Sequence, residues 1–258
     1  MKRGRGYNDY CISLDVDWAP DWCIEEIAGV LDEEKVKATW FVTHLTPAIK
    51  KFIFSNSLFE VGIHPNFFPG STQGSTVDEI MANLKGIAPQ AVSVRTHGLF
   101  QSSPLLRTMR EQYKILFDCS LFLLMSENLA PHEIFFSDSG KGLIRIPCFW
   151  DDDLGMYEMH PRHTLNDPRF NVQGLKVLDF HPIHILLNSE NMHAYEKCKK
   201  IKKDIAALQR KEIEHLINKR QGTRTFFQAI VKKLSDNKSS RTISEVGLAW
   251  KKSRGNQR

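Results

Sequence analysis

Short apolar segments with the length of β-strands alternate along this chain with segments that have the periodicity of helices. Parallel strands need a crossover of roughly a dozen or more residues, usually a helix, so the alternation predicts an α/β fold built on a parallel sheet or barrel. The predicted helices between the strands cover residues 21–34, 47–54, 77–84 and 104–113. The predicted strands cover residues 10–14, 38–43, 58–63, 91–94, 115–117, 143–147 and 175–180. The IPCFW segment continues the strand at 143–147.

The C-terminal part of the chain differs from the rest in its charge. Helices are predicted at residues 190–219 and 226–234, and from Lys197 onward the chain has 18 Lys/Arg and 5 Asp/Glu, against 17 and 25 before it. Such a pattern is typical of a solvated helical face, and peripheral contact with an anionic membrane is the alternative. Aromatic residues do not interleave with these charges, so no nucleic-acid partner is expected. We expect one domain over residues 1–258, with a core at about 10–190 and a basic helical extension at about 190–258.

The composition is that of a soluble globular protein, with 41% apolar and 25% charged residues. No apolar stretch approaches the roughly 20 residues of a membrane-spanning helix, and the basic N-terminus has no apolar signal segment behind it. The five cysteines are odd in number and scattered, which indicates free thiols in a reducing compartment. We therefore expect a cytoplasmic protein.

Ionisable residues follow most of the predicted strands at the point where each strand ends. In βα architectures the carboxyl ends of the strands meet on one face, where active sites are built. A single histidine there would mean little, but a series of such residues favours a metal-dependent site. The residues in question are Asp15, Asp17, His44, His64, Arg95, His97, Asp151, Asp152, Asp153 and His181.

Asp15 and Asp17 stand one residue apart, directly after the first apolar segment. In an extended chain both side chains would point the same way, and their charges would repel each other. A divalent cation beside one aspartate would remove that repulsion and leave the other free to act as a base. Asp and His together suit Zn²⁺ or a similar ion that activates water and polarises a carbonyl group. The simpler alternative is that one aspartate caps the helix that begins near Pro20.

Five motifs taken together resemble those of a known family. SLDVDW, VGIHPNF, VRTHGLF, IPCFWDDD and VLDFHPIH occur in the order of the motifs of polysaccharide deacetylases, the NodB-homology group of carbohydrate esterases. The pattern is most similar to a branch associated with bacterial surface-polysaccharide (O-antigen) gene clusters, and it covers about residues 10–185. The resemblance implies a distorted (β/α) barrel of about seven strands. It also implies removal of N- or O-acetyl groups from sugars with a divalent metal, for which Zn²⁺ is the expected ion.

The resemblance also assigns roles to particular residues. It implies that Asp15 is the catalytic base and that Arg95 pairs with this base and keeps it ionised. It implies that Asp17 and His64 bind the metal. Further assignments concern the acidic motif that supports the site, the histidine that protonates the leaving amine, and the backbone N–H that helps bind the oxyanion. The acidic motif falls on the aspartates after Trp150, of which Asp151 is the preferred candidate, and the other two roles fall on His181 and Gly98, respectively.

The chain departs from the family pattern at the third metal ligand. The family has a second histidine four residues after the first, where this chain has Phe68, and phenylalanine cannot bind a metal. His97 stands where the family usually has proline, and it is the favoured replacement because imidazole is the better ligand. Asn66 and Gln73 are the alternatives.

Two functions follow from this pattern. The first is a metal-dependent deacetylase that acts on an acetylated amino sugar or polysaccharide intermediate in bacterial surface-polysaccharide biosynthesis. The second is a catalytically inactive carbohydrate-binding protein that retains the deacetylase barrel, which the missing histidine favours. The presence of Asp15, Arg95 and His181 together favours the enzyme, since a binding protein needs neither a base nor an acid.

Overall fold

A curled mixed sheet forms the centre of the molecule. The computed structural model describes residues 10–136, 140–157 and 163–255, and in these residues the strands form one sheet in the order β6-β7-β5-β4-β3-β2-β1-β9-β8. All neighbours are parallel except β6 and β7. The strands are β1 (Tyr10–Asp15), β2 (Ala38–Val42), β3 (Phe59–Ile63), β4 (Ser93–Val94), β5 (Phe117–Asp118), β6 (His132–Ile134), β7 (Leu143–Arg145), β8 (Cys148–Asp151) and β9 (Lys176–Phe180).

The sheet curls into a half-barrel, and the loop after β5 extends along β8. The backbone N–H of Cys148 donates to the carbonyl of Leu121 (2.8 Å), and the N–H of Met125 donates to that of Phe149 (2.8 Å). The expected α/β barrel-like fold is thus confirmed. The short antiparallel β6 was not predicted. The segment 143–150 is divided into β7 and β8, which lie far apart in the sheet order.

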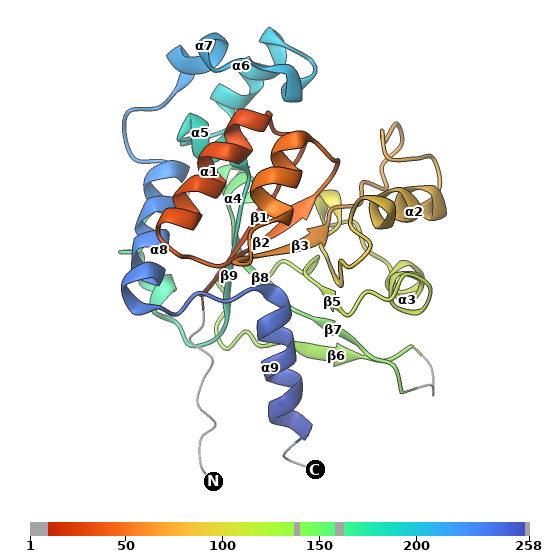
Figure 1. Cartoon of the computed structure of the whole chain (residues 1–258). Coiled ribbons are helices and arrows are strands. Elements are labelled where there is room, and N and C mark those ends of the chain that lie inside the picture. The colour runs from red at the N-terminus through yellow and green to blue at the C-terminus, as the bar shows by residue number, and fades with distance from the viewer. Residues whose placement is uncertain (1–9, 137–139, 158–162, 256–258) are drawn as a thin grey trace.

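Helices cover the outside of the curled sheet (Figure 1). α1 (Asp21–Glu33) buries Ile24, Ile27 and Leu31, which recur at helical spacing on one side. α2 (Val77–Ile87) and α3 (Ser103–Glu111) each begin after a capping hydroxyl, since Thr76 accepts from the N–H of Glu79 and Ser102 from that of Leu105. The segment predicted as a helix at 47–54 forms a π-helix over Ile49–Phe54.

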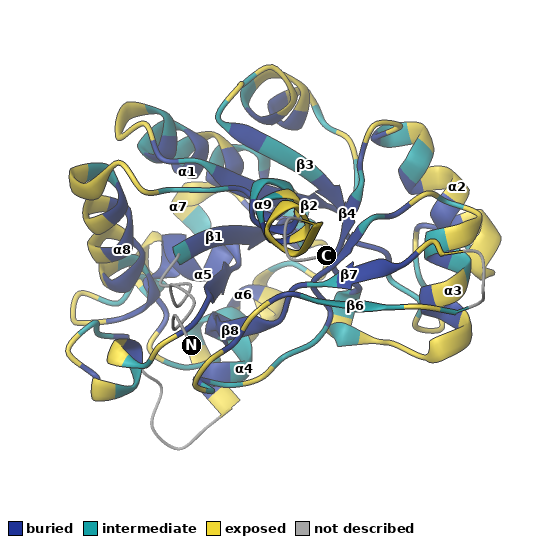
Figure 2. Ribbon diagram, turned by 90° about the horizontal axis from the view of Figure 1, so that it is seen from below, coloured by how far each residue is buried: buried dark blue, intermediate teal, exposed yellow. Residues whose placement is uncertain are grey.

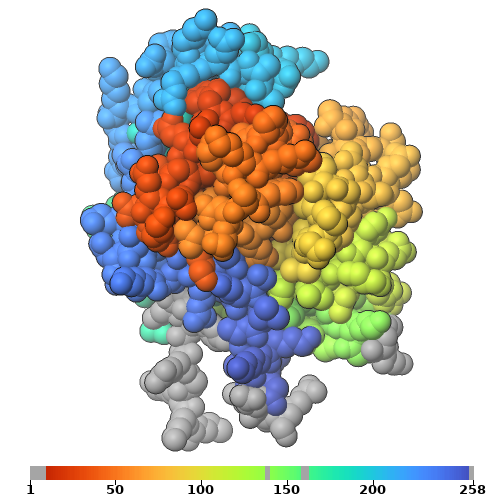
Figure 3. Space-filling model, in the orientation of Figure 1, coloured from red at the N-terminus to blue at the C-terminus, as the bar shows by residue number. Residues whose placement is uncertain are grey.

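The segment after β9 contains several short helices in place of the long one predicted at residues 190–219. The chain becomes extended at Lys202, and the carbonyl of Leu208 accepts a hydrogen bond from Trp22 Nε1 (2.8 Å). Contact with α1 therefore overrides the local helical pattern, and the prediction of one helix was wrong. This part covers the upper end of the molecule (Figure 3). The helices are α4 (Asp152–Tyr157), before β9, then α5 (Pro182–Leu187), α6 (His193–Ile201), α7 (Arg210–Ile213), α8 (Thr223–Asn237) and α9 (Ile243–Gly255).

The basic extension has apolar sides that join the core. Phe226 of α8 packs against Trp150, with ring centroids 4.8 Å apart, and Phe227 packs against Phe180. α9 lies in the middle of the ring of strands when the molecule is seen from below (Figure 2). The N–H of Ile243 donates to Thr39 Oγ1 near the start of β2 (2.9 Å), so α9 closes the end of the half-barrel at which the strands begin. The division into one domain with an extension stays a prediction.

Candidate active site

The carboxyl ends of β1, β3, β4, β8 and β9 surround a cavity of about 180 Å³ on the face opposite α9. Most of the ionisable residues predicted at strand ends line it. All five cysteines are buried, and none of them lines this cavity. His44 is an exception, because it does not line this cavity and its Nδ1 bonds to Thr43 Oγ1 (2.8 Å). The lining includes Asp15, Asp17, His64, His97, Asp151 and His181.

Three of these residues form a cluster suited to a cation. Asp17 Oδ1 lies 3.1 Å from His64 Nε2 and 3.1 Å from His97 Nδ1, and the two nitrogens are 3.3 Å apart. Ligands at about 2.0–2.2 Å from a tetrahedral ion are separated by roughly 3.3–3.6 Å. The three atoms therefore already have nearly the mutual spacing of three corners of such a tetrahedron. Asp17, His64 and His97 fit a zinc-like ion with a fourth position open.

The turn after β1 brings Asp17 to this cluster. Asp17 and Trp18 have left-handed backbone conformations, with φ of 42° and 54°, so the chain bends sharply after the strand. α1 has Pro20 at its N-cap without a capping side chain, so neither aspartate caps it. Burial alone would raise the pKa of Asp17. Hydrogen bonds from His64 and His97 outweigh this effect and hold the pKa well below its usual value.

The alternatives to His97 as a ligand are engaged elsewhere. Gln73 donates from Nε2 to the carbonyl oxygens of Thr43 and His64 (both 3.0 Å) and accepts from the N–H of Asn66 (2.7 Å). Asn66 Oδ1 accepts from the N–H of Phe68 (3.0 Å). Both side chains therefore shape the loop after β3 and do not reach the cluster.

Aromatic rings hold His97 from two sides. The ring of Phe68 stands nearly perpendicular to that of His97, at 85° and with centroids 6.2 Å apart. Trp18 makes a similar contact at 83° and 5.7 Å. Phe68 thus contacts His97, the residue predicted to replace the missing histidine. Gly98 follows His97 with φ of +60°, and a Cβ there would lie 2.7 Å from Phe68 Cε2, so the position favours glycine.

Below the cavity, Arg95 binds two buried carboxylates. Its Nη1 donates to Asp15 Oδ1 (2.9 Å) and also to Asp179, while Nη2 donates to Ser13 Oγ (2.9 Å). Burial raises the pKa of Asp15 to about 6 and outweighs the opposing charge of Arg95. Arg95 pairs with Asp15 as expected, but its second partner, Asp179, was missed. The only signal was an acidic residue inside the apolar VLDF strand.

On the opposite side of the cavity, Asp152 holds His181. Asp152 Oδ1 lies 2.7 Å from His181 Nδ1, and Oδ2 accepts from the backbone N–H of His181 (3.0 Å). Burial would lower the pKa of His181, but the charges of Asp152 and Asp153 raise it well above its usual value. Asp151 is the preferred prediction for the supporting aspartate, and this role stays a prediction, although the aspartate that contacts His181 is Asp152. Asp151 Oδ1 instead accepts from the N–H groups of Asp153 (3.0 Å) and Leu154 (3.2 Å) at the start of α4.

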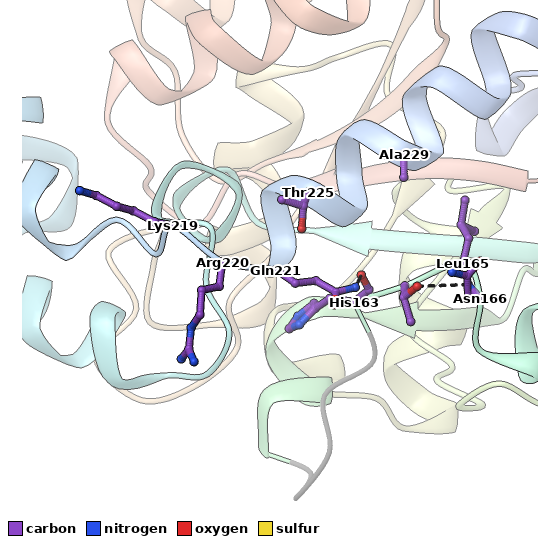
Figure 4. A pocket seen from close by; sticks show the side chains of 9 residues that line it. His163, Leu165, Asn166, Lys219, Arg220, Gln221, Thr225 and Ala229 are labelled. Atoms are coloured by element: carbon purple, nitrogen blue, oxygen red, sulfur yellow. Dashed lines mark hydrogen bonds between the residues drawn. The ribbon is translucent and has the colours of Figure 1, made fainter.

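A second, larger cavity of about 700 Å³ lies between the loop that begins at His163 and the start of α8 (Figure 4). Gln221 crosses it and donates from Nε2 to the carbonyl of His163 (2.8 Å). Arg220, at its edge, pairs with Glu190 (3.0 Å). None of the predicted site residues lines this cavity. The catalytic candidates therefore gather at the smaller one.

Comparison with known proteins agrees with the predicted family. The family model described as WbmS-like polysaccharide deacetylase matches residues 12–199. A search of curated proteins found no significant match.

Solved structures give one strong similarity. The crystal structure of WbmS from Bordetella bronchiseptica, described as a polysaccharide deacetylase involved in O-antigen biosynthesis, is 30% identical. Its TM-score is 0.76, and the match covers 88% of this chain and 91% of that one. A family 4 carbohydrate esterase from Bacillus anthracis is 14% identical with a TM-score of 0.41, covering 93% and 82% of the two chains. A family 4 pseudoenzyme from the same organism is 13% identical with a TM-score of 0.40, covering 83% and 66%. The last two similarities are too low to support an argument about function.

Proposed function

The chain belongs to the WbmS-like polysaccharide deacetylase family, and we propose that it is a metal-dependent hydrolase that removes the acetyl group from an N-acetylated sugar of a bacterial surface polysaccharide. The observation that carries the proposal is the spacing of Asp17, His64 and His97 around one point in the cavity. The description of WbmS supports O-antigen biosynthesis as the setting. O-acetylated sugars are the second substrate class.

We propose Zn²⁺ as the ion, because two imidazoles and one carboxylate are typical zinc ligands. When bound, such an ion would polarise the acetyl carbonyl and lower the pKa of a water molecule. Asp17 is suited to binding a cation, since its depressed pKa keeps it ionised. The two nitrogens must be unprotonated to bind. Burial lowers the pKa of His64 in that direction. Burial would also lower the pKa of His97, but the hydrogen bond and the charge of Asp17 raise it, so the cation would displace a proton there.

Asp15 is the proposed general base. It lies between Arg95, which fixes Oδ1, and His64, whose Nδ1 is 3.5 Å from Oδ2. A pKa of about 6 leaves Asp15 largely ionised at neutral pH and still basic enough to accept a proton from the attacking water. Arg95 is a positioning residue, because it fixes the carboxylate and lies below the cavity.

His181 is the proposed general acid. Its Nδ1 is held by Asp152, so Nε2 faces the cavity, 3.6 Å from Asp17 Oδ2. The raised pKa keeps a proton available on this ring at neutral pH. Amide hydrolysis then forms the new C–O bond, breaks the C–N bond, and passes the proton from Nε2 to the departing amine. The backbone N–H of Gly98, at the same cavity, is the proposed oxyanion donor.

We also propose that the protein works in the cytoplasm, which the buried free thiols of Cys23, Cys119, Cys148 and Cys198 support. In the described residues no helix combines the length and apolarity needed to cross a bilayer.

We further propose that the basic C-terminal region contacts the surface of an anionic membrane. It predicts binding to vesicles that contain phosphatidylserine, with a loss of binding as the salt concentration rises. Equal binding to neutral vesicles would contradict it.

The test of the enzymatic function combines metal content with acetate release. We expect the purified protein to bind one Zn²⁺ per chain and to release acetate from N-acetylated amino sugars. His97→Ala should lower zinc affinity at least tenfold, whereas His215→Ala, on an exposed helix, should leave it unchanged. Asp15→Asn should abolish acetate release while sugar binding persists. A wild-type protein that binds sugar, holds no metal and releases no acetate would favour the inactive carbohydrate-binding protein.

A further inference from the structure

A second group of possible ligands lines the active-site cavity, apart from the three candidate zinc ligands. One ligand atom each of Asp151, Asp153 and His181 lies within 4.8 Å of the other two. Asp151 ends β8, Asp153 lies in the first turn of α4, and His181 directly follows β9, which pairs with β8. Carboxylate oxygens and imidazole nitrogens are the ligands that zinc and similar divalent ions take in proteins.

The ring of His181 has one nitrogen that is free to bind a ligand. Nδ1 lies 2.7 Å from Asp152 Oδ1, which leaves Nε2. Nε2 is 3.6 Å from Asp17 Oδ2, too far for a hydrogen bond, and it has no other partner among the described residues. His181 is only 6% exposed and still lines the cavity. Buried polar atoms rarely lack a partner, so the free Nε2 indicates that a group from outside the chain binds there.

The carboxyl groups beside His181 lack the compensation that the lower carboxylates have. Asp15 and Asp179 belong to a similar cluster, but the guanidinium group of Arg95 pairs with both. In the described part of the chain, no lysine or arginine pairs with Asp151 or Asp153. The substrate does not supply the missing charge, because the nitrogen of an acetamido group is neutral until the C–N bond breaks. A cation from solution is therefore the favoured ligand.

We propose that Asp151, Asp153 and His181 bind a second divalent cation when the metal is in excess, and that this ion inhibits the enzyme. A protonated His181 brings one positive charge to the three carboxyl groups of residues 151–153, and a divalent ion compensates them more fully. Asp17 would contribute to both sites, with Oδ1 toward the first and Oδ2 toward the second. In two-metal sites the ions lie about 3.5–4 Å apart, a distance that the two oxygens of one carboxylate can span.

The inhibition follows from the role of His181, and this part of the inference rests on the proposed function. A metal ion takes the lone pair of Nε2, where the general acid carries its proton. With the ion bound, no proton passes from this nitrogen to the departing amine. The second ion has to displace that proton and is repelled by the first ion. We therefore expect it to bind about tenfold or more weakly than the first.

The experiment titrates Zn²⁺ into the metal-free protein by calorimetry and measures acetate release at the same zinc concentrations. We expect two binding events in the wild type. Acetate release should rise with the first event and fall by about tenfold or more as the second site fills, because a general acid typically contributes at least that much.

Two variants assign the binding events to their sites. Asp153→Asn should remove the second event and the inhibition, while its first event persists and reports that the variant is folded. His97→Ala should weaken the first event and keep the second. Asp236→Asn changes an exposed aspartate on α8 in the same way, and as the matched control it should keep both events.

The outcomes separate the second site from the proposed reaction. If the wild type binds two ions, Asp153→Asn binds one, and no acetate is released at any zinc concentration, the reaction fails and the second site stands. If the wild type binds a single ion and releases acetate, the second site is overturned and the reaction stands. Two binding events in Asp153→Asn also overturn the site. An undiminished rate of acetate release with both ions bound overturns its inhibitory role.

Discussion

The two halves of the candidate site are built in different ways. Below the cavity, Arg95 and Asp179 are fully buried, and the guanidinium group bonds Asp15, Asp179 and Ser13 at once. At the mouth, Asp17 and His97 remain 17% and 30% exposed in their side chains, and the cluster contains one carboxylate and two imidazoles. The lower network thus contains a buried cation, the guanidinium group of Arg95. In the upper cluster, the three candidate ligand atoms are spaced to bind a cation from solution.

This difference separates two requirements of catalysis. A buried charge must be compensated within the protein, because the desolvation cost otherwise destabilises the fold. A cation site at a mouth must instead stay accessible and exchange its ligand with solvent. The lower network therefore contributes to the folded state and orients the base, while the upper cluster affects function with little effect on stability in the absence of the ion.

The largest expected effect comes from breaking the lower network. Arg95→Met leaves Asp15 and Asp179 buried without a positive partner, and we expect it to lower the free energy of unfolding by about 3–5 kcal/mol. Urea unfolding at pH 7 measures this loss. Arg220→Met is the control, because Arg220 pairs with Glu190 at the surface with 79% of its side chain exposed and should cost less than about 1 kcal/mol.

A second substitution decides whether charge is the cause. Asp179→Asn in the Arg95→Met background removes one of the two stranded charges with almost no change in shape. It should recover part of the lost stability. A double variant as unstable as Arg95→Met would mean that lost packing of the guanidinium against Phe41, and not stranded charge, explains the effect.

A buried histidine behind the cavity should make the stability of the fold depend on pH. His184 is fully buried, packs against His181 and Tyr195, and its Nδ1 lies 3.0 Å from Ser189 Oγ. Burial lowers the pKa of His184 to about 3. In the unfolded chain the pKa of this histidine is about 6.5. At a pH between the folded and unfolded pKa values, only the unfolded state binds the proton. The free energy of unfolding therefore falls as the pH falls through this range.

Protonation of His184 in the unfolded chain should therefore lower the free energy of unfolding by about 2 kcal/mol between pH 7 and pH 5. His184→Asn keeps a polar group beside Ser189 and cannot titrate in this range. We expect the difference in urea midpoint between pH 7 and pH 5 to be smaller in this variant than in the wild type. His193→Asn is the control, because His193 lies at the start of α6 outside this contact. Equal pH dependence in the wild type and His184→Asn would contradict the account.

Parts of the site that lie at strand ends could be predicted from the sequence. The carboxyl ends of parallel strands meet on one face, and this rule places Asp15, Asp17, His64 and His97 together although they belong to distant segments. The preference for His97 over Asn66 followed from ligand chemistry alone. The α/β class with a largely parallel sheet also followed from the alternation of segments, whereas the order of the strands did not.

Other parts depended on geometry that the sequence does not encode locally. The choice between Asp151 and Asp152 depends on the irregular pairing between Cys148 and Trp150, which shifts the register of β8 against β9. Asp179 becomes recognisable as a functional residue only when Arg95, 84 positions earlier, is known to lie across the barrel. Local pattern reading cannot supply such long-range pairs.

The smallest of the expected effects concerns the aromatic support of the upper cluster. Phe68→Ala removes the ring that stands edge-on to His97 and leaves all three candidate ligands in place. Groups that orient a ligand typically change metal affinity by about 10–100-fold, and an apolar contact belongs at the lower end of that range. We expect zinc to bind about tenfold more weakly by calorimetry, with the unfolding midpoint of the metal-free protein nearly unchanged. Phe135→Ala, which truncates an exposed ring beyond β6, is the control. Unaltered zinc affinity in Phe68→Ala would contradict this account and would mean that His97 is oriented without the ring of Phe68.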